Sequence, residues 1–148
     1  MVGTGAAALA DAVALTRHAS ELGFAGALVL PPFYYKGVPD DGLVAYIDTI
    51  VKATAQQPIP IYLYHYPQQS GLHWHVALVR RLLDTFGARI VGLKDSSGDM
   101  NYAREAAAIK LAATGEAYSK TPRARQRPQN SCFGAKRPVW PAPRRFRR

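Results

Sequence analysis

Residues 88–99 read ARIVGLKDSSGD, and this stretch decides the fold class. Its first half is apolar on both faces, which is typical of a strand in a parallel sheet. Its second half is a polar loop that ends in Asp99, a residue type that commonly caps helices. The stretch therefore predicts a strand over 88–94, a loop over 95–99 and a helix from Met100 to about residue 113.

The same alternation of apolar runs and helical patterns continues towards the N-terminus. Short apolar runs predict two more strands at 26–30 and 59–64, and amphipathic patterns predict helices at 6–22, 40–54 and 74–86. Because successive strands are joined through helices, we expect them to run parallel. The sequence therefore predicts an α/β fold with about three parallel strands, and the pattern leaves an open sheet and a barrel as alternatives.

The chain divides into two regions by charge and composition. Its 148 residues carry a net charge of +9, but residues 1–117 hold nine Lys/Arg against ten Asp/Glu, whereas residues 118–148 hold ten Lys/Arg and no acid. Residues 117–148 also contain five prolines and no apolar period. We therefore predict a folded domain over 1–116 and a disordered Arg/Pro-rich basic tail over 117–148. A uniformly basic nucleic-acid-binding fold is disfavoured, because the folded part is nearly neutral.

The sequence also disfavours several kinds of site and location. The single cysteine, Cys132, excludes an internal disulfide framework and a multi-thiolate metal site. The four histidines lack ligand spacing, so we predict no metal site. No apolar run approaches the roughly 18 residues of a membrane span, and the N-terminus lacks the early positive charge of a signal peptide. We expect a cytoplasmic protein that does not act on membranes.

Two polar side chains stand at the carboxyl ends of neighbouring predicted strands, where ligands gather in parallel α/β folds. Lys94 directly follows an apolar run, so we expect its stem to begin inside the sheet. A desolvated lysine has a lowered pKa, and its free amine can attack a carbonyl and form a Schiff base. Tyr64 ends the preceding strand, and its phenol can move a proton for that chemistry. The pattern leaves open an alternative, in which Lys94 extends into water and Tyr64 is a half-buried edge aromatic.

Four motifs occur in order between residues 2 and 107: GTG at 3–5, LPPFYYK at 30–36, YHYP at 64–67 with SG at 70–71, and GLKDSSGD at 92–99. Together they resemble the dihydrodipicolinate synthase/N-acetylneuraminate lyase family. That family carries a tyrosine in Y-N-x-P and its Schiff-base lysine in G-[IL]-K-x-[ST]-[SG]-G-D. The resemblance is specific, because four motifs match in both order and spacing.

The resemblance implies a class I aldolase or lyase on a (β/α)8 TIM barrel. Such an enzyme forms a Schiff base with pyruvate or another 2-oxo acid and then makes or cleaves a carbon–carbon bond. By resemblance, Lys94 forms the imine and Tyr64 relays protons. Tyr34 matches the family's second tyrosine, which reaches into the site of a neighbouring subunit, so a homo-oligomer is implied. No metal or dissociable cofactor is implied, because the protonated imine is itself the electron sink.

This chain departs from the family pattern in three respects. Gln69 stands where the synthase proper has an arginine that grips the carboxylate of the second substrate, so dihydrodipicolinate synthesis is in doubt. His65 replaces the asparagine, which makes the motif more similar to the sugar-acid and 2-keto-acid aldolases. The family's first three strands and last two have no counterpart, so the resemblance implies a truncated central fragment. The Arg/Pro bias of the tail is typical of translation in a wrong frame.

Two alternatives to an active enzyme remain open at this stage. One is a non-catalytic remnant of the family. The other is a nucleic-acid-binding module that acts through the Arg-rich tail, whose ten positive charges would bind nucleic acid non-specifically.

Overall fold

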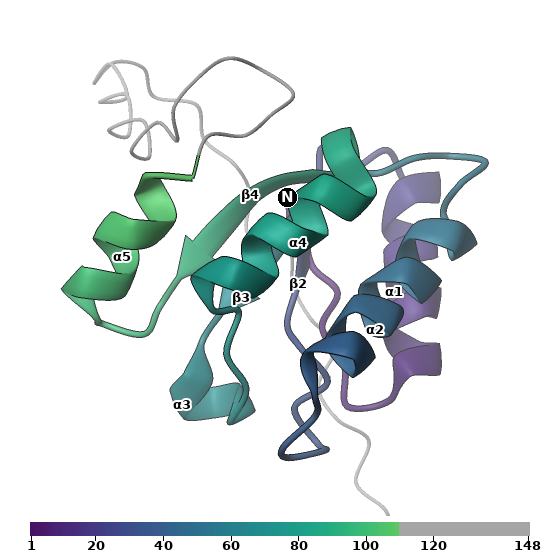
Figure 1. The fold of residues 1–148 in the computed structure, drawn as a ribbon. Helices are drawn as coiled ribbons and strands as arrows, with labels where there is room; N and C mark the ends of the chain where they lie inside the picture. The colour runs from purple at the N-terminus through teal and green to yellow at the C-terminus, as the bar shows by residue number, and fades with distance from the viewer. Residues whose placement is uncertain (110–148) are drawn as a thin grey trace, which may run out of the picture.

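Four parallel strands form one sheet in the order β1-β2-β3-β4, in a computed structural model that describes residues 1–109. The strands are β1 (Val2–Gly3), β2 (Ala27–Val29), β3 (Ile61–His65) and β4 (Ile90–Asp95). The helices are α1 (Leu9–Glu21), α2 (Asp40–Ala53), α3 (Pro67–Ser70), α4 (Val76–Phe86) and α5 (Met100–Ala107), with a 3-10 turn, η1 (Gly87–Arg89), before β4. Helices α2 and α4 lie in front of the strands in Figure 1. The α/β class with parallel strands is therefore confirmed.

The structure contains two elements that the sequence pattern did not predict. Strand β1 has only two residues, which pair with β2 and are too few to show a hydrophobic period. Helix α3 is a single turn that begins at Pro67, and so short a helix has no amphipathic stripe. Helix α5 ends at Ala107 rather than near residue 113. The predicted domain boundary at 116 and the predicted disordered tail over 117–148 lie outside the described residues.

The core lies between one face of the sheet and helices α1, α2 and α4. Val29, Ile61 and Leu63 are fully buried on that face, whereas the alternating residues Leu28 and Tyr62 are only half-buried. Side chains of a strand point alternately to its two faces. In the described residues, the helices cover one face of the sheet, and the residues on its other face are therefore less buried.

A buried pair of hydroxyls attaches the end of β1 to α1. Thr4 and Thr16 are 1% and 0% exposed, and their Oγ1 atoms form a hydrogen bond of 2.9 Å. Thr16 Oγ1 is also hydrogen-bonded to the carbonyl of Ala12 at 2.7 Å. Buried hydroxyls are costly unless they are paired in this way. The threonine of the GTG motif therefore serves the packing of β1 in this structure.

One irregularity interrupts the pairing of β3 with β4. The register shifts between Ile61 and Tyr62, because Val91 is an extra residue in β4. In such a bulge the extra residue is left unpaired, and the alternation of side chains between the two faces of the sheet is shifted by one position. Beyond it the register is regular, and Tyr64 pairs with Lys94.

The ring of Tyr62 lies close to a glycine on each neighbouring strand segment. A Cβ atom at Gly92 would lie 2.7 Å from Tyr62 Cδ1, and one at Gly26 would lie 2.7 Å from Cε2 on the opposite edge of the ring. Real Cβ atoms do not approach other atoms so closely. The glycine of the GLK motif is thus explained by packing against Tyr62.

Candidate active site

The carboxyl ends of β3 and β4 bring two of the predicted site residues together. Tyr64 and Lys94 are register partners in these parallel strands, so their side chains leave the sheet on the same face. The face is the half-buried one, opposite the helices. The neighbouring strands therefore place an amine and a phenol side by side.

The amine of Lys94 contacts both the ring of Tyr64 and the next loop. Its Nζ atom lies 3.7 Å from the centroid of the Tyr64 ring, which is a cation–π contact. It also donates a hydrogen bond of 2.8 Å to Ser96 Oγ. The Ser96 hydroxyl in turn donates to the phenol oxygen of Tyr64 at 3.4 Å. The ring of Tyr66 stacks on the ring of Tyr64, with the two ring centroids 5.7 Å apart.

These contacts change the acidity of the phenol. Hydrogen bonding to Lys94, and secondly to Ser96, lowers the pKa of Tyr64 below its ordinary value, and burial opposes this only weakly. The positive charge of Lys94 acts in the same direction as these hydrogen bonds, because it favours the phenolate. Tyr64 therefore releases its proton more readily than an ordinary tyrosine.

Lys94 is exposed, and the expected desolvation of its amine is absent from the described structure. The reason is its position on the face of the sheet that the helices do not cover. The alternative, in which Lys94 extends into water and Tyr64 is a half-buried aromatic, agrees with the exposure of both side chains, but Nζ is also hydrogen-bonded to Ser96 and lies over the Tyr64 ring. The amine is thus accessible and still held in one place.

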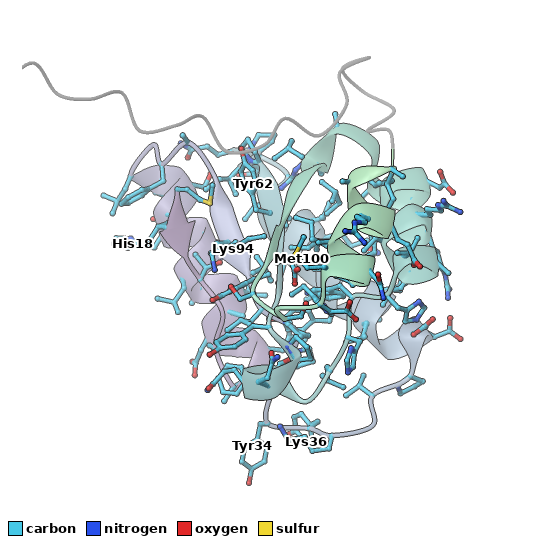
Figure 2. The ribbon with its side chains drawn as sticks, turned by 90° about the vertical axis from the view of Figure 1, so that its left-hand side faces the viewer. His18, Tyr34, Lys36, Tyr62, Lys94 and Met100 are labelled. Atoms are coloured by element: carbon cyan, nitrogen blue, oxygen red, sulfur yellow. The ribbon has the colours of Figure 1, made fainter. Side chains whose placement is uncertain are left out.

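Tyr34 does not join the other two predicted site residues. It lies in the loop between β2 and α2, is 72% exposed, and packs edge-on against Tyr35 with ring centroids 5.4 Å apart. Figure 2 shows Tyr34 and Lys36 at the bottom of the molecule, well below Lys94. The predicted action of Tyr34 in the site of a neighbouring subunit stays a prediction.

The last residue of β3, His65, is a buried histidine that contacts Trp74 and Tyr102. His65 is 2% exposed, its Nδ1 accepts a hydrogen bond of 3.2 Å from the Trp74 backbone, and its ring stacks on Tyr102 with centroids 4.0 Å apart. The hydroxyl of Tyr102 donates to the carbonyl of Trp74. Burial lowers the pKa of His65, against a smaller opposing effect of Asp95. A neutral His65 therefore joins β3 to α5 and fixes the backbone next to Tyr64.

The loops at this edge of the sheet are tied to one another by side chains. Lys36 Nζ donates to the carbonyls of Phe33 at 2.8 Å and Ser70 at 2.9 Å, which joins the loop of Tyr34 to α3. Gln68 Nε2 donates to the Ser97 carbonyl at 2.6 Å, which joins α3 to the loop after β4. These hydrogen bonds fix the loop after β2, helix α3 and the loop after β4 relative to one another at the carboxyl ends of the strands.

The loop after β4 behaves as the sequence predicted, with one residue missed. Asp99 caps α5 by accepting hydrogen bonds from the backbone of Asn101 and Tyr102, so its predicted capping role is confirmed. Ser96 was not predicted as a site residue. Its signals were a hydroxyl two positions after Lys94 and the Ser/Thr position of the family motif, but such a loop serine is usually read as part of a helix cap.

The described residues form neither a cluster of metal ligands nor a membrane-spanning helix. Residues 1–109 contain no group of three or more His, Cys, Asp or Glu side chains that could hold a metal ion. In the same part of the chain, no helix combines the length and the apolar character needed to cross a membrane.

Comparison with known proteins gives consistent matches over most of the described chain. Residues 1–114 match the model of the dihydrodipicolinate synthetase family. An uncharacterized DapA-like lyase from Chloroflexus aurantiacus is 39% identical over 104 residues, which cover 70% of this chain and 34% of that protein. A 4-hydroxy-tetrahydrodipicolinate synthase from Methanococcoides burtonii is 38% identical over 106 residues, which cover 71% of this chain and 34% of that protein.

Solved structures give the same match. Dihydrodipicolinate synthase from Agrobacterium tumefaciens has a TM-score of 0.66 and 30% identity, with 70% of this chain and 36% of that chain covered. A 2-keto 3-deoxygluconate aldolase from Picrophilus torridus has a TM-score of 0.64 at 24% identity, covering 72% of this chain and 36% of the other, and shows a shared fold. The chain thus spans about a third of the length of these relatives.

Proposed function

This chain belongs to the dihydrodipicolinate synthetase family, and on that premise we propose that it performs the chemistry of a class I aldolase or lyase on pyruvate or another 2-oxo acid. The fold class of a partial (β/α)8 barrel is confirmed by the superposition of its parallel sheet and helices on dihydrodipicolinate synthase. The activity itself is proposed, because the chain covers about a third of its relatives.

One observation carries the proposal: the amine of Lys94 lies 3.7 Å from the ring centroid of Tyr64 and is joined to its hydroxyl through Ser96. A lysine amine attacks the keto carbon of a 2-oxo acid, and loss of water from the resulting carbinolamine leaves an imine on Nζ. Tyr64, whose pKa is lowered by its neighbours, is suited to move the protons that these steps require.

The ring of Tyr64 supports the same reaction in a second way. A protonated imine carries its positive charge at the position where the ammonium of Lys94 now lies. The face of an aromatic ring attracts such a charge. Since the protonated imine draws electrons from the neighbouring carbon–carbon bond, an environment that keeps it charged favours bond making or cleavage without a cofactor.

Gln69 bears on the choice of the second substrate. It is an exposed residue of α3, at the position where the synthase proper has an arginine. A neutral amide cannot form the charged, bidentate pair that arginine forms with a carboxylate. We therefore propose an aldehyde partner that lacks this carboxylate requirement, and not the substrate of dihydrodipicolinate synthesis.

We further propose a cytoplasmic homo-oligomer in which Tyr34 completes the proton relay of a neighbouring copy. The support is the position of Tyr34 in this structure: it is 72% exposed and directed away from the Lys94 site of its own chain. An aromatic side chain so exposed is suited to contact a partner.

Reductive trapping tests the proposed activity on the full chain. Sodium borohydride added with pyruvate is expected to leave a reduced pyruvyl group on Lys94, located by mass spectrometry of the digested protein. Lys94→Ala should lose the adduct, whereas Lys52→Ala should keep it, because Lys52 is an exposed lysine that pairs with Asp48 on α2. Wild-type protein without an adduct, or an adduct that persists in Lys94→Ala, would overturn the proposal.

The basic tail supports a second candidate function, non-specific binding of nucleic acid. Residues 118–148 hold ten Lys/Arg and no acid, whereas the rest of the chain is nearly neutral. Binding through such a segment falls steeply with salt, because it depends on release of counterions. A chain that ends at residue 116 should lose this binding, and retained binding would show that the tail is not the binding element.

A further inference from the structure

Ser96 occupies a position that the motifs alone do not explain. It lies in the loop directly after β4, and its Oγ atom stands between two polar atoms from neighbouring strands. It accepts a hydrogen bond from Lys94 Nζ at 2.8 Å and donates one to the phenol oxygen of Tyr64 at 3.4 Å. The second contact is long, but catalytic hydrogen bonds are often long before the substrate is bound.

The backbone holds Ser96 in this position independently of its side chain. Its N–H donates a hydrogen bond of 2.8 Å to the carbonyl of His65 at the end of β3. The following residue, Ser97, is fixed by a bond from its own N–H to Asp95 at 2.9 Å and by the bond from Gln68. The hydroxyl of Ser96 is thus presented to Lys94 and Tyr64 by a loop that is anchored on both sides.

We infer that Ser96 is a proton-relay residue that connects the amine of Lys94 to the phenol of Tyr64 during formation of the imine. This inference rests on the proposed Schiff-base function. The three atoms Nζ, Oγ and Oη form a chain in which each donates to the next, so one proton can pass along it without any atom moving far.

Formation of the carbinolamine moves one proton along this chain of three atoms. The ammonium of Lys94 first gives one proton to solvent, and the lone pair left on Nζ then forms a bond to the keto carbon while the electron pair of the carbonyl moves to its oxygen. The surplus proton on nitrogen passes to Ser96 Oγ, the proton of Ser96 passes to the phenol oxygen of Tyr64, and the phenolic proton of Tyr64 passes to the new alkoxide. A neutral carbinolamine results, and both hydroxyl groups end with one proton each.

Ser97 provides a matched control for this role. Its hydroxyl accepts a hydrogen bond of 3.1 Å from the backbone of Asp99 and has no contact with Lys94 or Tyr64 among the interactions found in residues 1–109. Ser97→Ala therefore removes a hydroxyl from the same loop but leaves the relay intact. Ser96→Thr keeps a hydroxyl at the relay position, and Ser96→Ala removes it.

The first test measures the rate at which the full chain forms the borohydride-trapped pyruvyl adduct, over a range of pH. Ser96→Ala should slow adduct formation about 100-fold, which is the lower end of what proton transfer by a positioned side chain contributes. Its pH profile should also change, whereas Ser97→Ala and Ser96→Thr should stay close to wild type. If wild type forms the adduct and Ser96→Ala forms it at the same rate, the relay is refuted while the proposed function stands.

The second test does not depend on activity. Tyrosine labelled with ¹³C at the phenol carbon reports the ionisation of each ring by NMR, and Tyr64→Phe identifies the signal of Tyr64. Ser96→Ala should raise the pKa of Tyr64, because one of the hydrogen bonds that lowers it is removed. Ser97→Ala should leave that pKa unchanged. A Tyr64 pKa that is the same in Ser96→Ala and wild type would show that the contact does not exist in solution, and would overturn the inference even if no pyruvate adduct forms.

Discussion

The close approach of Tyr62 to Gly92 predicts that an added methyl group at residue 92 will destabilise the fold. A Cβ atom there would start 2.7 Å from Tyr62 Cδ1 and 2.9 Å from Cε1, whereas carbon atoms in contact normally lie about 3.5–4.0 Å apart. The ring cannot move away freely, because its opposite edge lies equally close to Gly26. Overpacking of this kind costs about 1–3 kcal/mol. Replacement of glycine also lowers the conformational entropy of the unfolded chain, and this stabilises the folded state by about 0.4–1 kcal/mol.

Gly92→Ala should therefore lower the free energy of unfolding by roughly 1.3 kcal/mol, because a mid-range overpacking cost of about 2 kcal/mol exceeds a mid-range gain of about 0.7 kcal/mol. Urea denaturation of the full chain, followed by circular dichroism, measures this loss. Gly3→Ala is the matched control, since a Cβ at Gly3 in β1 meets no atom within 4 Å. It should leave stability unchanged or raise it by up to about 1 kcal/mol.

A second variant identifies the cause of the loss. In a Tyr62→Leu background the ring is gone, so adding Gly92→Ala should cost less than about 0.5 kcal/mol more, and the two substitutions should show a coupling energy. The reasoning is refuted if Gly92→Ala is as stable as Gly3→Ala, or if its cost is the same with and without the Tyr62 ring.

Two further predictions concern the supports of the site. Because burial lowers the pKa of His65, the unfolded chain, where histidine titrates near about 6.5, binds this proton more readily than the folded one, and stability should fall as the pH drops below that value. His65→Asn should flatten this dependence in urea titrations between about pH 5 and pH 8; an unchanged slope would contradict the assignment. Lys36→Met removes both bonds from Nζ to the Phe33 and Ser70 carbonyls, and backbone amides of residues 33–36 should then exchange roughly tenfold faster, whereas Lys52→Met should not alter them. Equal exchange in the two variants would show that Lys36 does not hold the loop.

The sequence predicted the parts of this fold that depend on local patterns. The apolar runs around Val29, Leu63 and Ile90 marked three strands, because each run is long enough to show burial. Asp99 was recognised as a cap from its place before a helical segment, and it accepts two backbone hydrogen bonds. The two residues of β1 could not be predicted in this way, since their pairing with β2 depends on a strand more than twenty residues away.

The sequence predicted where the site lies, but it did not predict how exposed its side chains are or which residues contact them. The predicted order of the strands places Tyr64 and Lys94 at the carboxyl ends of two neighbouring strands, and both residues belong to the family motifs. The exposure of Lys94 depends on what covers the second face of the sheet, and no local pattern contains that information. Ser96 was missed because its role depends on a contact with a phenol from another strand, 32 residues earlier in the chain.

The extra residue in β4 has a consequence for how easily such a site could be lost. Because side chains alternate along a strand, the bulge at Val91 decides that Lys94 pairs with Tyr64; if every residue of β4 were paired in turn, Lys94 would pair with His65 on the helix-covered face. Deletion of Val91 would remove the bulge and still leave Lys94 opposite Tyr64, because Gly92 would keep its place opposite Tyr62. A register that paired Val91 with Tyr62 would instead direct the amine into the packed interior, although every motif residue would be unchanged. For this sheet, the register between strands is thus as much a part of the chemistry as the residues themselves.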